Sequence, residues 1–493
     1  ADARQSGQRA LHWLLAATLI FAPLFRSGQP AIATLVLELL AVATLFLVLS
    51  RPRPDLITRG EMLALALLIA LPVLYLVPLP ASMVGWLPGW EPYLTGLSLL
   101  GKEAAGDVLT LSVYPLETES ALLLLLVPVG VFLGTRVLEA GRVFQLVLLL
   151  LGIAAAQALL GLLQYGTGAG SLELFGISVA DLRSAQGTYT NRNHLAGLLE
   201  MVLPIALALT IYSVGRRSGD DERGWRERVA FLASVRGHTA LVYGALALLL
   251  IVAVIFTRSR AGIALSMLGV ILSTMMFARR IGGDNVYGAT GTNLAVALGA
   301  AVAIGQLPVL DRFTVEGEIE DALWWIFSST LEAIGSFAPL GCGPGNYPDV
   351  FPAFQPLELG RWFINHAHND YLEWLFEGGL LAAGLILLLL VLYARQWGRV
   401  WSKGAWSRAR FVQVASGIGI LLLLLHSLVD FNLHMPGNIV YFAFLAGLFL
   451  ADPEAEVRPA RRRKRRTPDL DPTSAVPVSE AKAQVAAPAD QIK

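Results

Sequence analysis

The stretch Asn365–Gly379 holds the densest run of titratable side chains beside a long apolar segment. It contains two histidines, one aspartate, two glutamates and two asparagines, and the apolar run Leu380–Leu392 follows directly. Polar groups at the mouth of an apolar span are costly to desolvate, so their presence there indicates a functional site. The rest of the chain is then expected to hold this stretch at one face of a membrane.

His366 and His368 are the first candidates for chemistry in this stretch. Because a histidine titrates near neutral pH, its imidazole can take a proton from a hydroxyl group. Two residues apart, the histidines share a face in extended chain. We expect Asn369 or Asp370 to cap the helix that follows. Both histidines then lie in the loop at its mouth, and we favour His368 as the functional one.

Asn369, Glu373 and Glu377 recur every fourth residue, so on a helix they share one face. Glu377 would lie roughly two turns into the membrane, where a carboxylate should face the bundle interior and find a donor. We therefore interpret Glu377 as structural, bonded to a neighbouring span or to a loop arginine. Glu373 is expected to hold the same helix in place.

Two arginines, Arg258 and Arg260, occur in a short turn between two apolar segments. A guanidinium group is always protonated, and its planar fork matches phosphate oxygens. Two of them could clamp a diphosphate at the membrane surface, with Ser259 and Gly262 allowing close backbone approach. The alternative role is topological anchoring, but anchoring arginines are expected on the cytoplasmic side.

A third arginine, Arg192, precedes another apolar segment and is flanked by asparagines. We expect Asn193 to cap that helix. Arg192 either contacts an anionic ligand or lies at the membrane interface. The sequence supports these two roles equally. The neighbouring His194 is expected to serve either as a polar contact or in helix packing.

A final polar cluster surrounds Asp430, Asn432 and His434. These residues alternate as in extended chain, so they line the same site or cap helix ends, and both alternatives stay open. His366, His368, Asp370 and His434 could in principle form a metal set. Their spacing matches no established zinc motif, and nearby arginines would repel a cation. We therefore expect a site without metal or other cofactor.

Composition places these residues in a polytopic membrane protein. Hydrophobic residues make up 55% of the chain and charged residues 15%, whereas a soluble protein has roughly 25% charged residues. The single cysteine, Cys342, excludes an internal disulfide and a cysteine-based metal cage. The predicted fold class is all-α, a polytopic transmembrane helical bundle.

A helix that spans the hydrocarbon layer needs about 20 mostly apolar residues, and about twelve windows qualify. They lie near residues 10–26, 30–50, 60–78, 119–135, 143–163, 194–214, 239–257, 261–278, 290–308, 370–394, 412–430 and 436–451. With the N-terminus inside, arginine and lysine concentrate in the predicted cytoplasmic loops. This assignment makes both termini cytoplasmic and exposes Arg192, Arg258 and Arg260 on the opposite face.

Three regions follow along the chain. We predict N-terminal transmembrane helices over 1–184, a catalytic membrane domain over 185–452, and a disordered basic cytoplasmic tail over 453–493. The tail is expected to favour anionic lipid headgroups. Within the second region, the outside loop 309–369 is long enough to act as a lid. It is expected to contain a helix near Glu316–Ser336, with an apolar side, and a tight turn at Gly341–Tyr347.

The run from His366 through Glu377 to Gly379, together with the arginine pair at Arg258 and Arg260, resembles the O-antigen ligase and O-antigen polymerase family of bacterial inner membranes. The resemblance covers roughly residues 185–450. It implies a helical glycosyltransferase of the GT-C kind that takes a glycan from undecaprenyl diphosphate at the periplasmic face. The acceptor is a lipid A-core sugar for a ligase and another lipid-linked repeat for a polymerase.

The resemblance also implies residue roles. The reaction inverts the anomeric centre without a metal, and the family's loop histidine corresponds to His368. Its periplasmic arginines correspond to Arg258 and, less directly, to Arg192 or Arg260. His366 is a departure because many members have one histidine here, so the sequence leaves open which of the two is the base. Asn193, Asn369, Asp370, Glu373, Glu377, Asp430 and His434 are expected to support the site or line the substrate.

Two other classes of protein remain as alternatives. A transporter or flippase of lipid-linked oligosaccharide fits the number of spans, and Glu377 could be its coupling carboxylate. The sequence shows no paired half-chains of the kind found in transporters, and its polar groups gather at one membrane face. A purely structural assembly partner does not account for the convergent arginines and histidines. A transferase is therefore the leading hypothesis.

Overall fold

A computed structural model describes residues 2–50, 56–99, 108–167, 184–215, 233–281, 317–401 and 406–452. By its contacts the chain divides into Ala1–Pro453 and Glu454–Lys493. The predicted tail and the predicted span at 290–308 lie outside the described residues. The division of the remainder at residue 184 stays a prediction.

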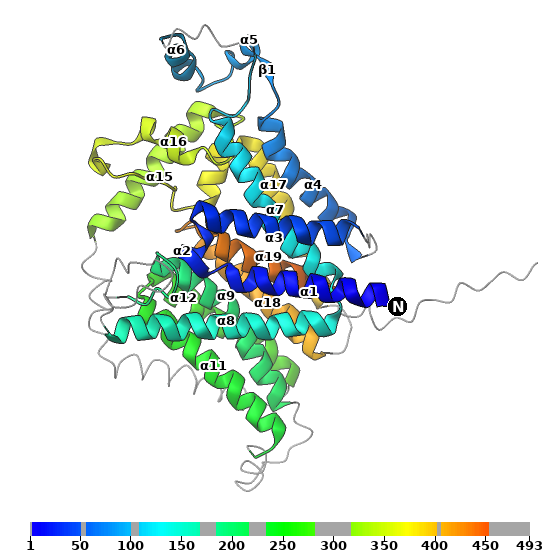
Figure 1. Ribbon diagram of the computed structural model, residues 1–493. Coiled ribbons are helices and arrows are strands. Elements are labelled where there is room, and N and C mark those ends of the chain that lie inside the picture. The colour runs from blue at the N-terminus through cyan, green and yellow to red at the C-terminus, as the bar shows by residue number, and fades with distance from the viewer. Residues whose placement is uncertain are drawn as a thin grey trace, which may run out of the picture. The chain divides into compact units, whose positions relative to one another are not determined.

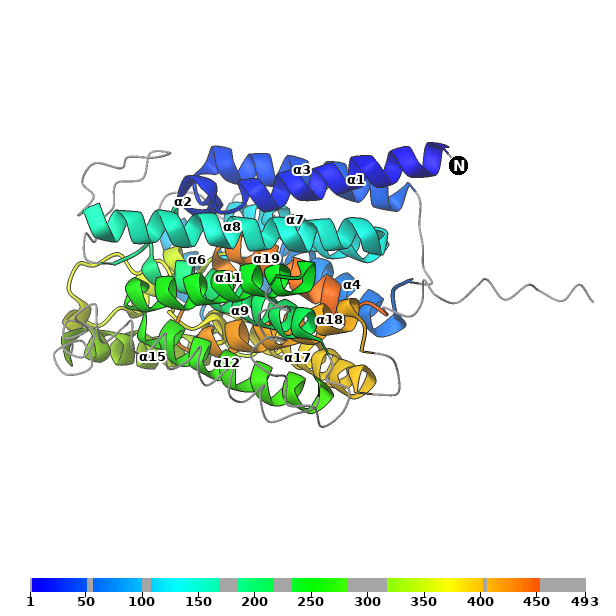
Figure 2. The same cartoon turned by 90° about the horizontal axis from the view of Figure 1, so that it is seen from below.

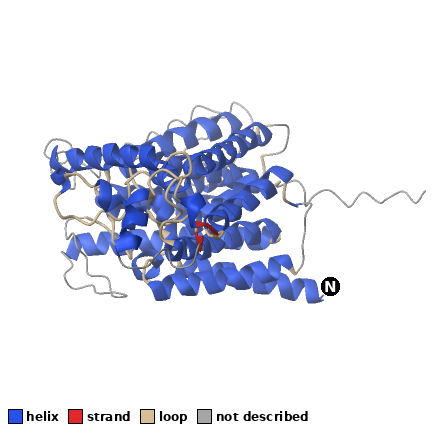
Figure 3. Ribbon diagram, turned by 90° about the horizontal axis from the view of Figure 1, so that it is seen from above, coloured by secondary structure: helices blue, strands red, loops and turns tan. Residues whose placement is uncertain are grey.

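Long helices form most of the described chain (Figures 1 and 3). They are α1 Asp2–Phe21, α3 Ala31–Leu49, α4 Arg59–Tyr75, α7 Pro115–Val137, α8 Ala140–Thr167, α9 Arg192–Val214, α11 Val235–Thr257, α12 Arg260–Ile281, α17 Asp370–Val400, α18 Arg408–His426 and α19 Pro436–Leu450. Each overlaps one of the predicted spans. The all-α, polytopic prediction is therefore confirmed for the part of the chain that the structure describes.

Within the described residues, eight helices are long and apolar enough to cross a membrane: α3, α7, α8, α9, α11, α12, α17 and α18. The apolar helix α19 has only 15 residues. The prediction for 412–430 places the end of α18 four residues too late, because the helix ends at His426 and the chain turns through Ser427–Phe431. The count of twelve spans stays a prediction.

Helices α9 and α18 form the centre of the bundle. Inside its apolar window α9 is 83% buried and α18 is 78% buried, against 28% for α3. The helices α8, α11, α12 and α18 all pack on α9, and α19 packs on α18. Figure 2 shows the long helices running in a common direction, with the N-terminus at one end and α15 at the other. We call the latter the mouth end.

Short elements gather at the mouth end. The predicted outside loop contains α15 Gly317–Phe337, α16 Tyr347–Val350 and the 3₁₀ turns η2 Phe351–Phe354 and η3 Leu357–Leu359. The kinked turn α2 Leu24–Gly28, the helices α5 Ala81–Val84 and α6 Glu91–Leu99, and a hairpin of β1 Leu79–Pro80 with β2 Val108–Leu109 come from the N-terminal part. Short helices in the loop were predicted, and residues 317–369 contain them.

Helix α15 agrees with the predicted helix, but its apolar residues do not share one side. Ile326 is buried at 4% exposure in a small core with Phe337 and Phe376. Trp324 and Leu331 are exposed at 72% and 57%. A tryptophan with this exposure suits a membrane interface, where its ring meets lipid and its N–H meets water. The helix therefore presents one apolar side to protein and another outward.

Helix α17 contains a backbone break at Gly379, whose φ is +52°. The break frees the carbonyls of Phe376 and Glu377, and these accept the N–H groups of Cys342 and Gly343 at 3.0 and 2.8 Å. The predicted tight turn at Gly341–Tyr347 therefore exists, with positive φ at Gly341, Gly343 and Gly345. Its backbone closely approaches α17, whereas the sequence left open an approach to a ligand.

Candidate functional site

Three parts of the chain meet around the carboxylate of Asp430. Asp430 lies in the turn between α18 and α19, and its Oδ1 is 3.7 Å from Nε2 of His194 in the first turn of α9. Nδ1 of His368, in the loop before α17, lies 3.6 Å from the same oxygen. Asp430 is 1% exposed, whereas His368 is 31% exposed. A buried acid thus stands behind an imidazole that solvent can reach.

The histidines control the charge of Asp430. Burial alone would raise the pKa of this carboxyl, but His194 and His368 hold the pKa well below its ordinary range. Asp430 is therefore a carboxylate at neutral pH. A buried carboxylate next to an imidazole orients the ring and stabilises its protonated form.

The backbone fixes the position of His368. Its φ is +51°, a left-handed conformation that costs energy for a residue with a side chain. The next residue, Asn369, caps α17 by accepting the N–H groups of Tyr371 and Leu372 at 3.0 and 3.1 Å. Its side-chain amide also donates to the carbonyl of Leu428. The predicted cap at Asn369 is confirmed, and it ties the loop to the turn that carries Asp430.

A second group, which we call the histidine cluster, comprises His366, Asp370, Glu373 and His434. Nδ1 of His366 lies 2.7 Å from Oε1 of Glu373. Nδ1 of His434 lies 2.5 Å from Asp370, and its Nε2 is 3.4 Å from the same Glu373 oxygen. We call residues 317–369, the described part of the predicted outside loop, the mouth loop. The cluster therefore joins the mouth loop, the first turn of α17 and the 3₁₀ turn η4 Asn432–His434.

The carboxylates of the histidine cluster determine the charge of His434. Burial disfavours the imidazolium form, but Glu373 and Asp370 outweigh it and raise the pKa of His434 to about 10. His434 is thus protonated at neutral pH when nothing else binds to the cluster. The sequence left open whether Asp430 and His434 line the same site or cap helix ends. In the structure Asp430 contacts histidines and His434 contacts carboxylates, and their role in a site stays a prediction.

Phe431 joins the two groups and is missed by the sequence analysis. Its ring stacks on His366 with centroids 4.3 Å apart, and it meets His368 edge-on at 4.8 Å and His194 at 4.7 Å. Phe431 is an apolar residue between Asp430 and Asn432, and its type gives no sign of a functional role. Only its position beside Asp430 could have indicated one. Phe431 places His366 and His368 on either side of one ring.

One expectation about a helix cap is wrong. Helix α9 begins at Arg192 and its cap is Asn191, which accepts the N–H of Asn193 at 2.8 Å. Asn193 therefore donates its backbone N–H to the cap and lies two residues too late to be the cap itself. Glu373 does more than hold its helix, because it is a member of the histidine cluster.

Glu377 has the structural role that was expected, with a different partner. Its Oε1 accepts the backbone N–H of Tyr347 at 3.0 Å. The partner of this Glu377 oxygen is therefore the glycine turn at Gly341–Tyr347, and not a neighbouring span or an arginine. The backbone N–H of the loop thus satisfies an oxygen of this buried carboxylate, as buried polar groups require.

The three predicted arginines lie at helix ends on the same side of the bundle. Arg192 and Arg260 are the first residues of α9 and α12, and Arg258 caps α11 in a left-handed conformation with φ +58°. A Cβ on Gly262 would come within 2.5 Å of Ala196 in α9. Gly262 and Ser259 therefore serve helix packing, which brings the arginine turn against the start of α9.

One polar pair deeper in the bundle was not predicted. Glu200 of α9 and His426 of α18 are both fully buried, with Oε1 and Nδ1 2.9 Å apart. The spacing of one acid and one histidine on different helices carries no sequence signal. This pair lies below the turn of Asp430 and holds the two central helices together.

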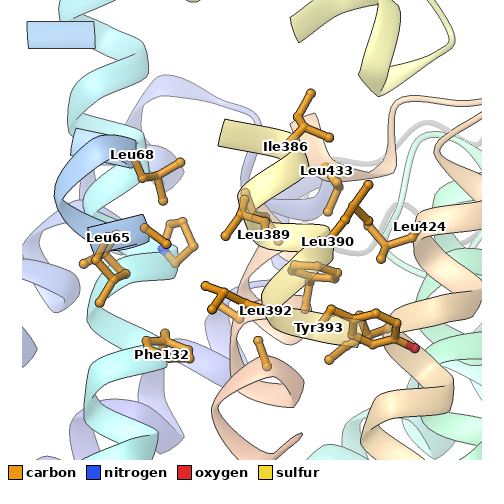
Figure 4. A pocket seen from close by; sticks show the side chains of 18 of the residues that line it. Leu65, Leu68, Phe132, Ile386, Leu389, Leu390, Leu392, Tyr393, Leu424 and Leu433 are labelled. Carbon is orange, nitrogen blue, oxygen red and sulfur yellow. The ribbon is translucent and has the colours of Figure 1, made fainter. Parts of the chain in front are cut away.

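An apolar groove leads away from the site. It has a volume of about 230 Å³ and is lined by α4, α7, α17, α18, η4 and α19, with Asp370 and Tyr371 at one end and Glu61 at the other. Figure 4 shows Leu389 of α17 on the side of Leu65 and Leu68 of α4, whereas Tyr393 points the other way, where its hydroxyl donates to the carbonyl of Gly417 in α18. A groove between spans with an acidic histidine cluster at its end suits a lipid with a polar headgroup.

Part of the chain matches the model of a known protein family. Residues 245–389 match the family model described as O-antigen ligase. The match includes Arg258, Arg260 and the histidine stretch, and it confirms the family resemblance, although it covers a shorter segment than expected. Arg192, Asp430 and His434 lie outside it. No curated protein matches the chain.

Proposed function

We propose that this chain, a membrane protein that carries an O-antigen ligase domain, moves a glycan from undecaprenyl diphosphate to the hydroxyl group of an acceptor sugar. The acceptor belongs to a lipid A-core in a ligase and to another lipid-linked repeat in a polymerase. The mouth end then faces the periplasm. The observation that carries the proposal is an exposed His368 backed by the buried carboxylate of Asp430 at the end of a lipid-sized groove.

His368 acts as the base in this proposal. The Asp430 carboxylate on the Nδ1 side favours the tautomer with its proton on Nδ1, which leaves the lone pair of Nε2 for the acceptor hydroxyl. The hydroxyl oxygen forms a bond to the anomeric carbon as the bond from that carbon to the diphosphate oxygen breaks. The proton goes to Nε2 of His368. Attack opposite the leaving group inverts the anomeric centre.

The arginines act on the leaving group. Negative charge grows on the diphosphate as its bond to the sugar breaks, and guanidinium groups fixed before the reaction stabilise that charge. Arg258 and Arg260 flank one turn, and the packing of Gly262 on Ala196 places that turn beside the start of α9 with Arg192. The diphosphate is a good leaving group, so the transfer requires no acid and no step through a metal.

The groove accommodates part of the lipid chain. Its wall along α17 extends from Asp370 to Tyr393, about 35 Å for a helix rising 1.5 Å per residue. A polyprenyl chain in the groove would place its diphosphate at the end where α17 begins. The mouth loop would then cover the reacting groups and exclude water, which would otherwise hydrolyse the donor.

The test is transfer by purified protein in proteoliposomes that contain a glycan linked to undecaprenyl diphosphate. Wild-type protein should release undecaprenyl diphosphate and form the glycosylated acceptor. His368→Ala and Arg258→Ala should each lower kcat/KM by about 100-fold or more. The exposed residues His238 and Arg236, at the start of α11, supply the matched controls His238→Ala and Arg236→Ala.

Two results would contradict the proposal. Transfer at the wild-type rate in both site variants would remove His368 and Arg258 from the mechanism. Movement of the lipid-linked glycan across the bilayer without release of undecaprenyl diphosphate would assign the chain to the transporter class instead. Circular dichroism and gel filtration of each variant separate loss of chemistry from loss of fold.

A further inference from the structure

Three ligand atoms of the histidine cluster come from three separate segments and converge on one point. One ligand atom from each of His366, Glu373 and His434 lies within 4.8 Å of the other two, and Oε1 of Glu373 faces both Nδ1 of His366 and Nε2 of His434. Neighbouring ligands of a tetrahedral zinc ion, bound at about 2.1 Å, are about 3.4 Å apart. The Glu373–His434 separation of 3.4 Å already has this value. The Glu373–His366 separation of 2.7 Å needs to widen by well under one ångström.

The surrounding groups fix the orientation of two of these ligands. Oε2 of Glu373 accepts the N–H of Ala367 at 2.8 Å, which leaves Oε1 facing the histidines. Asp370 holds Nδ1 of His434 and also accepts the N–H of Leu433 at 2.9 Å, which turns Nε2 of His434 toward Glu373. A carboxylate behind a ligating histidine is the arrangement that surrounds metal ions in proteins and fixes the ring tautomer.

Charge and access also favour a cation. Glu373 and Asp370 are buried carboxylates with 1% and 2% side-chain exposure. Once both imidazoles are neutral, as metal binding requires, no other charge in the cluster offsets these two carboxylates. His366 and His434 are 18% and 19% exposed, so one side of the cluster is open to solvent. The arginines that were expected to repel a cation are not members of the cluster, since they lie at the ends of α9, α11 and α12. Both carboxylates are members of the cluster.

We propose that His366, Glu373 and His434 bind a divalent transition-metal ion of the zinc class. Two imidazole nitrogens and one carboxylate oxygen suit zinc, whereas magnesium and calcium prefer oxygen ligands alone. Binding displaces the proton of the cluster to solvent, because only the neutral imidazole has a lone pair for the metal. The open side leaves a fourth position for water.

The role of the ion would be to hold protein segments in position. It ties the mouth loop, α17 and η4 at one point, and its ligand His366 stacks on Phe431, the ring that His368 also contacts. The ion would therefore fix the wall beside His368 without touching the reacting groups. This inference does not depend on the proposed transfer, which runs through His368 and the arginines.

The direct test is metal binding to the purified full chain, with an affinity tag that contains no histidine. After treatment with a chelator, the protein is titrated with Zn²⁺ and the bound metal is measured by mass spectrometry. We expect one equivalent per chain, and a higher melting temperature when Zn²⁺ is present. Mg²⁺ at the same concentrations should leave the melting temperature unchanged.

Variants identify the ligands. Glu373→Gln and His434→Gln should weaken Zn²⁺ binding at least about 100-fold, and Asp370→Asn about 10- to 100-fold. The matched controls are Glu332→Gln and His238→Gln, because both side chains are exposed on the surface away from the cluster. They should bind Zn²⁺ as the wild-type protein does.

A second measurement keeps the inference testable if the buried Glu373 variant does not fold. His366 is partly exposed, so His366→Gln is expected to fold, and Co²⁺ reports the geometry by its visible absorption. Wild-type protein should give the intense bands of four-coordinate Co²⁺, and His366→Gln should lose them. The inference is overturned if Zn²⁺ fails to bind at micromolar concentration, or if the ligand variants bind as much as the controls.

Discussion

The two ends of the apolar groove both contain buried acids, and they differ in what those acids meet. At the end away from the mouth, Glu61 bonds to Arg136 at 3.3 Å and to the N–H of Thr58 at 2.8 Å in a helix cap. Both side chains of this pair, which we call the basal pair, are at most 5% exposed. At the mouth, Asp430 and Glu373 meet histidines that are 18% to 31% exposed.

This difference separates structural acids from functional ones. The basal pair matches one fixed cation to one carboxylate, and both side chains are almost completely buried. The acids at the mouth stand behind partly exposed imidazoles, which can contact a ligand from the open side. A buried charge next to a membrane span therefore indicates a site only when its partner is exposed and titratable.

The largest effect is expected from breaking the basal pair. Arg136→Ala leaves Glu61 buried without its cation, which should lower the free energy of unfolding by about 3–5 kcal/mol. Thermal denaturation in detergent measures the loss of stability. Transfer per folded molecule should stay at the wild-type rate, because the pair lies at the far end of the groove from His368.

The control removes both members of the basal pair. Glu61→Met with Arg136→Met leaves no unpaired charge, so its stability should lie within about 1 kcal/mol of the wild-type value. If the folded Arg136→Ala protein lost transfer activity while the double variant kept it, the two ends of the groove would be coupled, and their separation into structural and functional parts would be wrong.

The next effect is on catalysis. Asp430→Asn keeps the shape of the side chain but removes the charge that orients His368, so kcat should fall about 100-fold, equivalent to about 2.7 kcal/mol in the barrier. The melting temperature should change little. Steady-state transfer with saturating donor measures this loss. A variant with wild-type kcat would show that Asp430, like Glu61, serves only the fold.

The smallest effect concerns the groove between the two ends. Leu389→Trp adds volume to a residue that lines the groove, and it should raise KM for the long polyprenyl donor by about tenfold, equivalent to about 1.4 kcal/mol. A donor with a short lipid chain should show no such increase. Leu387→Trp, on the same helix but not among the lining residues, is the control. An equal KM increase for both donors would contradict lipid binding in the groove.

The sequence predicts well the features that depend on neighbouring residues. Long apolar windows locate eleven of the helices, because hydrocarbon excludes unpaired backbone groups and only a helix of that length pairs them internally. The cap at Asn369 follows from a side chain next to its own helix. The cap of α9 shows the limit, since Asn191 and Asn193 offer the same chemistry and only the start of the helix decides between them.

The sequence does not predict which helix ends meet. His434 and Asp370 are 64 residues apart, and Glu373 joins them only because α17 and η4 pack at the mouth end. The metal set that the sequence analysis considered and rejected contained His366 and His434, but it included His368 and omitted Glu373. His368 is turned away from that set by its left-handed backbone, toward Asp430. Tertiary packing therefore brings Glu373 into the cluster, and the φ angle of His368 keeps that residue out of it.

The break at Gly379 has a mechanical consequence for a protein in a bilayer. A Cβ at this position would come within 2.1 Å of the carbonyl of Pro339, so the joint requires glycine. The mouth loop is bonded on both sides of this joint. Cys342 and Gly343 donate to the carbonyls of Phe376 and Glu377 above it, and the N–H of Leu380 below it donates to the carbonyl of Pro339 at 2.9 Å. A helix tilts when bilayer thickness changes. A tilt of residues 380–400 would therefore be passed directly to the mouth loop at this joint.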